Sequence, residues 1–338
     1  MRSQRLQIIL LVACLLSPIS GFASWEKGAA AYEAGDFETM VREWQVAAEQ
    51  GHPRAIFALA KLYKSGEHVT RNLSESLRLF RIGAEQGDAL SQAGLAEMFS
   101  KGLGVKQNDA EALKWYTSAA ENGEALSQYE LGVIYREGRG TARDAEKSAT
   151  WFSLAAENGE LRAQQRLGLY YRYEADPPNY QEAIKWLSVA ADRGAPLAQN
   201  ELGLMYRDGV GVPQDRRAAL TWFKKAACCY DDAMRQLAFM YYRGFGTPQD
   251  YKAAFKWNRA AASLGHSGAQ VALAVAYFNG QGTLQDYIYA HMWANIAAAN
   301  DPDAITFRND MEKRLVPHQL AEAQRLAMEC VQKNYKNC

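Results

Sequence analysis

The stretch AAENGEALSQYELGVIY (119–135) returns 36 residues later as AAENGELRAQQRLGLYY (155–171). The first residue of this block has a counterpart at every step of 35 or 36 residues along the chain: Ala47, Gly83, Ala119, Ala155, Ala190, Ala226, Ala261 and Ala297. Self-similarity at a fixed period of this size is typical of a solenoid made of stacked helical units. We therefore predict one long repeat array.

Each unit carries signals for both ends of a helix. Eleven positions before the anchor residue stands an Asp or Asn, whose side-chain oxygen can accept from the free amides of a first helical turn. Four positions after the anchor, six of the eight units have a glycine, which tolerates the left-handed conformation that ends a helix. The predicted caps are Asp36, Asn72, Asn108, Asp144, Asn179, Asp215, Asp250 and Asp286.

Apolar columns complete the unit. A tryptophan four residues before the anchor, as at Trp115, shares a helix face with it, and we expect its ring to pack against the next unit rather than to bind a ligand. A second helix follows the pattern AQxxLGxMY, in which the small residue after Leu, as at Gly132 and Gly203, lets two helices approach closely. Loops such as GVGVPQD (209–215) lack the Lys-Ser/Thr of a phosphate loop, so we interpret them as turns.

The N-terminus has the composition of an export signal. MRSQR is basic, LQIILLVACLL is apolar, and Gly21 and Ala23 are small residues at a cleavage site. We expect residues 1–23 to be removed near Ala23, leaving a periplasmic or secreted protein. In the alternative, LVAC marks a lipoprotein anchored through Cys14. No later window approaches 18 consecutive apolar residues, so we expect no transmembrane segment in the mature chain.

The repeated columns resemble the Sel1-like repeat family, which is related to the tetratricopeptide repeats. AQNELGLMYRDGVGVPQDRRAALTWFKKAA (198–227) matches that pattern almost throughout. The resemblance implies an all-α protein, a right-handed superhelical solenoid of antiparallel helix pairs. We expect N-terminal capping helices over residues 24–51, about seven units over 52–301, and closing helices with a tail over 302–338.

The resemblance also implies which surface could bind a partner. In tetratricopeptide-like stacks the helix carrying AQxxLGxMY lines the concave face. Two columns of variable residues follow from this: Phe57, Ala93, Tyr129, Gln165, Asn200, Arg235 and Val271, and Lys64, Ser100, Arg136, Arg172, Arg207, Tyr242 and Phe278. Arg and Tyr are favoured binding anchors. Our hypothesis is that Tyr129, Arg136, Gln165, Arg172, Asn200, Arg207, Arg235 and Tyr242 hold a segment of another protein, with an acidic one as a candidate; the alternative is a solvated face.

Catalytic motifs are weak. Formal net charge is zero, which argues against a nucleic-acid partner. We find no metal-binding His pair and no nucleophile elbow, and we predict no catalytic residue, metal or cofactor. The leading hypothesis is a non-catalytic interaction scaffold. The alternative is a β-lactamase-like or peptidoglycan-fragment-binding envelope protein, although the Ser-x-x-Lys spacing of SWEK (24–27) lacks its partner motifs.

The mature chain has four cysteines, which allow three pairings. We favour a disulfide between Cys330 and Cys338, because KNYKNC (333–338) can turn back on the preceding helix. Cys228 and Cys229 are adjacent at a helix end. They are either a redox or metal site or, in the interpretation we prefer, two partly buried thiols.

Overall fold

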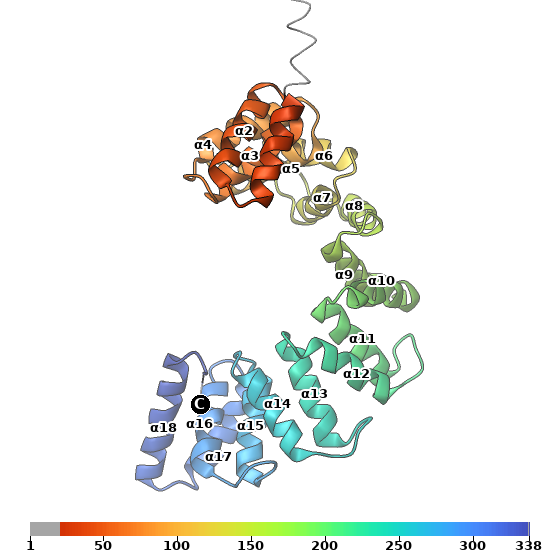
Figure 1. Ribbon diagram of the computed structural model, residues 1–338. Helices are drawn as coiled ribbons and strands as arrows, with labels where there is room; N and C mark the ends of the chain where they lie inside the picture. Colours follow the sequence, from red (N-terminus) through yellow and green to blue (C-terminus); the bar gives the residue numbers. More distant parts are fainter. Residues whose placement is uncertain (1–20, 337) are drawn as a thin grey trace, which may run out of the picture. The chain divides into compact units, whose positions relative to one another are not determined.

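The computed structural model describes residues 21–336 and 338. Most of the predicted export signal and the alternative lipid attachment site, Cys14, therefore lie outside the described residues. Across the described ranges the chain forms helices and turns and no strand (Figure 1). The all-α prediction is confirmed.

The helices follow one another at short intervals, and neighbours in sequence pack together in pairs. A helix covers residues 21–33. After it come α2 (Phe37–Glu49), α3 (Pro53–Ser65), α4 (Leu73–Glu85), α5 (Ala89–Lys101), α6 (Asp109–Glu121), α7 (Ala125–Glu137), α8 (Ala145–Glu157), α9 (Leu161–Leu169), a π-helical turn η1 (Tyr170–Glu174), α10 (Tyr180–Asp192), α11 (Pro196–Asp208), α12 (Arg216–Ala226), α13 (Asp231–Arg243), α14 (Tyr251–Ala262), α15 (Ser267–Asn279), α16 (Tyr287–Ala297), α17 (Pro302–Glu312) and α18 (Pro317–Gln332).

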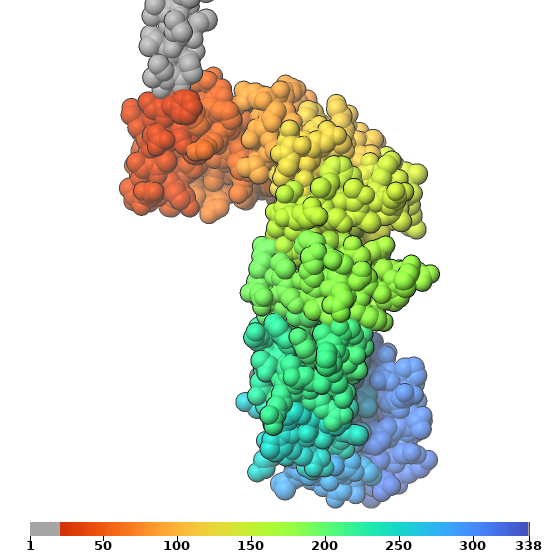
Figure 2. All heavy atoms as spheres, turned by 90° about the vertical axis from the view of Figure 1, so that its right-hand side faces the viewer, coloured from red at the N-terminus to blue at the C-terminus, as the bar shows by residue number. Residues whose placement is uncertain are grey.

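The chain separates into two compact units, which divide between Gln164 and Gln165. Each has an apolar core of its own, from Ala31 to Ile134 in the first unit and from Ala219 to Cys330 in the second. Within each unit, successive helix pairs are in close contact. Figure 2 shows neighbouring stretches of the chain, in adjoining colours, packed against one another. No helix pair could bury its apolar face alone, so each neighbour supplies the missing wall.

The predicted helix ends are confirmed. All eight Asp and Asn side chains accept a hydrogen bond from a backbone amide of the first turn. The six glycines after the anchors have φ between 80° and 92°, which an L-residue rarely adopts. In the two units that lack this glycine, Tyr230 and Asp301 stand directly before α13 and α17 as N-cap residues.

The predicted close approaches are also present. A Cβ on Gly132 would lie 2.6 Å from the ring of Phe152, and a Cβ on Gly203 would lie 2.6 Å from that of Phe223. Trp115 and Trp151 are partly buried against the core of the first unit, and Trp293 is buried in that of the second. These columns therefore act in packing.

The glutamine of the AQxxLG pattern has a structural role that the sequence reading did not assign. It donates from Nε2 to a carbonyl oxygen eight residues earlier, at the end of the preceding helix, where carbonyls lack helical partners. The pairs are Gln92–Ala84, Gln128–Ala120, Gln164–Ala156 and Gln199–Ala191, at 2.9–3.3 Å. In two units its Oε1 also accepts from an asparagine 30 residues later, at the end of the following helix: Asn122 donates to Gln92 and Asn158 donates to Gln128.

The turn after α9 departs from the others, as the absence of glycines in YYRYEADPPNY (170–180) predicts. Elsewhere a left-handed glycine such as Gly138 or Gly209 ends this helix. Here the helix continues as the wider π-helical turn η1. It ends where the backbone N–H of Ala175 donates a hydrogen bond to the carbonyl oxygen of Tyr170. This local widening places Arg172 in the interior of the second unit.

Candidate functional site

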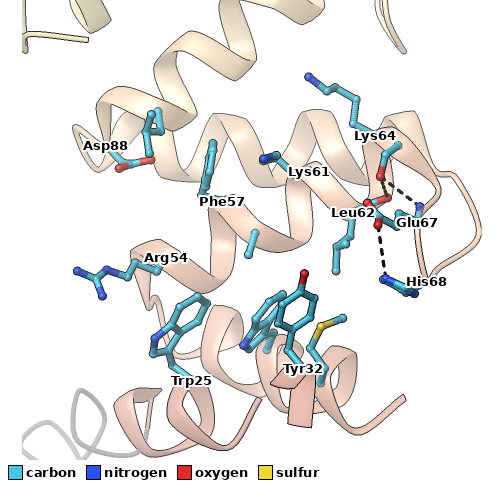
Figure 3. A pocket seen from close by; sticks show the side chains of 15 residues that line it. Trp25, Tyr32, Arg54, Phe57, Lys61, Leu62, Lys64, Glu67, His68 and Asp88 are labelled. Carbon is cyan, nitrogen blue, oxygen red and sulfur yellow. Dashed lines mark hydrogen bonds and ion pairs between the residues drawn. The ribbon is translucent and has the colours of Figure 1, made fainter. Parts of the chain in front are cut away.

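The first unit has a cavity of about 560 Å³ beside α3 (Figure 3). Trp25 and Tyr32 reach it from the helix of residues 21–33, and Phe57 and Lys61 stand on α3. Leu90, at the start of α5, completes the wall and is 48% exposed. An apolar surface of this size, open to solvent, is the usual form of a binding site.

Stacked aromatic rings form one wall of the cavity. The ring of Trp25 stacks on Trp44 at 5.1 Å and on His52 at 5.3 Å, between centroids. Tyr32 lies 6.4 Å from Trp44. Because these rings support one another, the wall is rigid and loses little entropy when a ligand covers it.

A second hollow, of about 480 Å³, adjoins the first and extends over α5 and α7. The two hollows share Phe57, Lys61, Lys64 and Leu90. The predicted column residues Phe57, Ala93, Lys64 and Ser100 therefore line hollows in this unit. The AQxxLG helices supply the hollowed face here.

The charges on this face are unevenly paired. Glu97 accepts from Lys64 at 2.6 Å and from Lys101 at 2.7 Å. Burial raises the pKa of Glu97, but these two ion pairs outweigh it and hold the pKa below its ordinary value. By contrast, Arg54 and Lys61 form no ion pair with any residue in the described ranges. Two cations beside an aromatic wall are thus available to an anionic group.

Two of the predicted binding residues belong to the first unit. Tyr129 is half-buried, and the guanidinium of Arg162 lies 4.4 Å from its ring centroid. Arg136 is exposed and pairs with Glu137 at 3.4 Å. Both remain on the surface of α7.

In the second unit the structure corrects the placement of two predicted residues. Arg172 and Asn200 are buried, at 9% and 3% exposure, and offer little surface to a partner. Arg172 turns inward at η1, where its Nη1 donates to the carbonyl oxygen and side chain of Glu201. Gln165 is half-buried on α9.

The other predicted residues of this unit differ in how they are held. The guanidinium of Arg207 makes two bonds to Asp208, at 2.7 and 2.8 Å, and a third to Gln236. Arg235 and Tyr242 line a cavity of about 300 Å³ between α13, α14 and α15. Arg207 is thus already paired, whereas Arg235 and Tyr242 face open space.

The four cysteines of the predicted mature chain form one close pair and two free thiols. The Sγ atoms of Cys330 and Cys338 lie 2.07 Å apart, as in a disulfide. Cys228 and Cys229 are free, and our expectation that they are partly buried is wrong, because both are exposed.

Within the described ranges, no three His, Cys, Asp or Glu side chains are grouped to hold a metal ion. None of the described helices combines the length and apolarity needed to cross a membrane.

His52 ties the cavity wall to the start of α3 and predicts a pH effect. Its Nδ1 accepts from the Ala55 amide, which requires a neutral ring, and burial followed by the charge of Arg54 lowers its pKa. Because the folded-state pKa is depressed, this stabilisation is complete above about pH 6.5 and is lost as the pH falls below that value. We expect wild type to lose more of its free energy of unfolding than His52→Asn does between pH 7.5 and 5.5. Urea unfolding at the two pH values measures this, and equal losses would contradict it.

Capped helix pairs at a constant period, each completing the core of its neighbour, define an α-helical repeat protein. The Sel1 repeat model matches seven consecutive segments: 53–88, 89–124, 125–160, 161–194, 196–231, 231–266 and 267–302. The chain belongs to the Sel1 repeat family. This fold is typical of protein–protein interaction scaffolds, and the family is generally non-catalytic.

Solved structures agree with this assignment. A Sel1 repeat protein from Oxalobacter formigenes is 27% identical, with a TM-score of 0.65 and 86% of each chain covered. The c5321 protein, a protective antigen present in uropathogenic Escherichia coli strains, is 29% identical, with a TM-score of 0.58, and covers 93% of this chain and 78% of its own. No curated protein matches.

Proposed function

We propose that the protein is an exported, non-catalytic adaptor that binds a segment of another polypeptide on the face formed by α3, α5 and α7. The observation that supports this most directly is the pair of adjoining hollows, which share Phe57, Lys61, Lys64 and Leu90. Export is supported by the basic and apolar N-terminal sequence with Gly21 and Ala23 at its end.

The chemistry of the face indicates what kind of segment would fit. Trp25, Trp44 and Phe57 offer an aromatic surface for an apolar side chain. Arg54 and Lys61, which have no ion-pair partner in the described ranges, stand beside it. A segment with an apolar anchor followed or preceded by an acidic residue would satisfy both.

The first test is site-specific crosslinking in the native cell envelope. A photo-reactive side chain at Leu90 lies in both hollows, whereas one at Val46 on α2 is exposed but lines neither of them. We expect Leu90 to capture one discrete polypeptide that Val46 does not capture. Capture of the same polypeptides from both positions would contradict the proposal.

The second step uses the captured polypeptide to test the face itself. We expect Phe57→Ala and Lys61→Glu each to weaken binding of that polypeptide about 10-fold or more, as loss of a central interface anchor does. Isothermal titration calorimetry with purified proteins measures this. The matched control is Lys252→Glu on α14, which reverses an exposed charge in the second unit. Unchanged affinity of both face variants would remove this face as the binding site.

A further inference from the structure

The cavity between α13, α14 and α15 belongs to the second unit and to different residues from those of the proposed adaptor face. Its volume is about 300 Å³. Most of its wall is aromatic or aliphatic, and it includes Phe239, Tyr242, Tyr251, Phe255, Val271 and Val275. A space of this size and lining accommodates one bulky apolar side chain.

A cation without a counter-ion lies in this apolar wall. Arg235 is partly buried, and the one hydrogen bond that it donates within the described ranges is long, from Nε to the carbonyl oxygen of Gly268 at 3.3 Å. No carboxylate in the described ranges forms an ion pair with it, and burial lowers its pKa. In the same unit, Arg172 and Arg207 each contact a carboxylate directly.

That contrast points to a ligand, because a charge removed from water normally gains a partner in the protein. A guanidinium presents a planar fork of donors that matches a carboxylate with two parallel hydrogen bonds. The remaining N–H groups of Arg235 are therefore suited to an anion that the protein itself does not supply.

Two acceptors at the same cavity also lack donors. Oδ1 of Asn258 and Oε1 of Gln281 are buried without a hydrogen-bond partner within the described ranges. Asn258 as a whole is only 7% exposed. An unmatched buried acceptor costs free energy, so a ligand that brings an N–H group to this wall would be favoured.

We propose that this cavity binds the carboxyl-terminal end of a polypeptide whose last residue is apolar. The terminal carboxylate pairs with Arg235. The last side chain lies among Phe239, Tyr251 and Phe255. The last amide N–H donates a hydrogen bond to Oδ1 of Asn258 or to Oε1 of Gln281. A fatty acid has the carboxylate and the apolar body but no N–H group, so it leaves both acceptors unmatched.

The test uses fluorescein-labelled hexapeptides that end in Val, Leu or Phe, each with a free carboxylate or a terminal amide. We expect at least one free-acid peptide to bind the full-length mature protein about 30-fold more tightly than its amide in fluorescence anisotropy titrations. Arg235→Gln should abolish that difference, and Arg217→Gln, an exposed arginine on α12, should retain it. Equal affinity for acid and amide in the wild type overturns the proposal.

Further arms separate the alternatives. Replacing the last peptide N–H by an ester oxygen should weaken binding to the wild type about 5-fold but not to the double variant Asn258→Leu/Gln281→Leu. N-acetyl amino acids should bind at least 10-fold more weakly than the peptides, and equal binding overturns the assignment to a polypeptide end.

Folding and independence need their own controls. Circular dichroism melting verifies the fold of each variant, and Arg235→Lys, which keeps the charge but not the planar fork, provides a second variant with reduced discrimination. Phe57→Ala should leave these affinities unchanged, because it lies in the first unit. The proposal for this cavity and the proposal for the adaptor face can therefore be refuted separately.

Discussion

Replacing Glu201 by leucine should lower the free energy of unfolding by about 3–5 kcal/mol, because the change leaves the charge of Arg172 buried and unpaired. The two side chains are 8% and 12% exposed, respectively for Arg172 and Glu201. The Glu201 carboxylate also accepts from the Tyr173 hydroxyl at 2.9 Å. Burial, and next the charge of Glu201, raise the pKa of Tyr173 to about 12, so this hydroxyl remains a donor at neutral pH.

The double variant Arg172→Met/Glu201→Leu should recover most of that loss, since it removes both charges together. Arg166→Met is the matched control: it breaks the more exposed pair between Arg166 and Glu174, whose atoms lie 2.7 Å apart, and should cost less than about 1 kcal/mol. Urea unfolding followed by circular dichroism compares the free energies of unfolding of Glu201→Leu, the double variant and Arg166→Met. If Glu201→Leu cost no more than Arg166→Met, the buried pair would have no special role.

Phe223→Ala should cost about 3–5 kcal/mol, because its ring is fully buried in the core of the second unit. The ring lies against Gly203 on α11, where a Cβ would be only 2.6 Å away. Thermal and urea unfolding measure the loss. Leu264→Ala, at a site 59% exposed, is the control and should change stability by less than about 0.5 kcal/mol.

The same contact predicts a coupling between the two positions. Gly203→Ala alone should destabilise the protein by about 1–3 kcal/mol through overpacking. In the Phe223→Ala background its cost should nearly vanish, because the space left by the ring accepts the new methyl group. Additive losses in the double variant would show that helix spacing at this point is not set by the ring and the glycine.

Helix caps and turns could be predicted from the sequence, because they depend on residues that are close together along the chain. Asp144 caps α8 and Gly159 ends the following turn because the preferences of Asp and Gly act within a few residues. The repeated pattern also marked Gly132 as a point where two helices approach closely, and there it meets the ring of Phe152.

The candidate sites could be predicted only in part, because they depend on partners distant in sequence. Arg172 was expected on an exposed face, but its partner, Glu201, lies 29 residues later, and the π-helical turn that carries it inward has no simple sequence signal. The wall formed by Trp25 and Trp44 was likewise missed, since it joins two helices that precede the matched repeats. Arg235 was predicted from its place in the repeated column, but only the structure shows that no carboxylate in the described ranges pairs with it.

The caps and the glutamine–asparagine hydrogen bonds recur with the period of the repeat, and this has a consequence for how such a chain can change over evolutionary time. Removing residues 108–143, one full period, would join Gln107 to Asp144 and replace one capping side chain by another. Asn158 would then stand where Asn122 now meets Gln92. Unequal recombination within the gene can therefore shorten or lengthen the array by whole periods. The size of the interaction surface then changes without any new type of contact between helices.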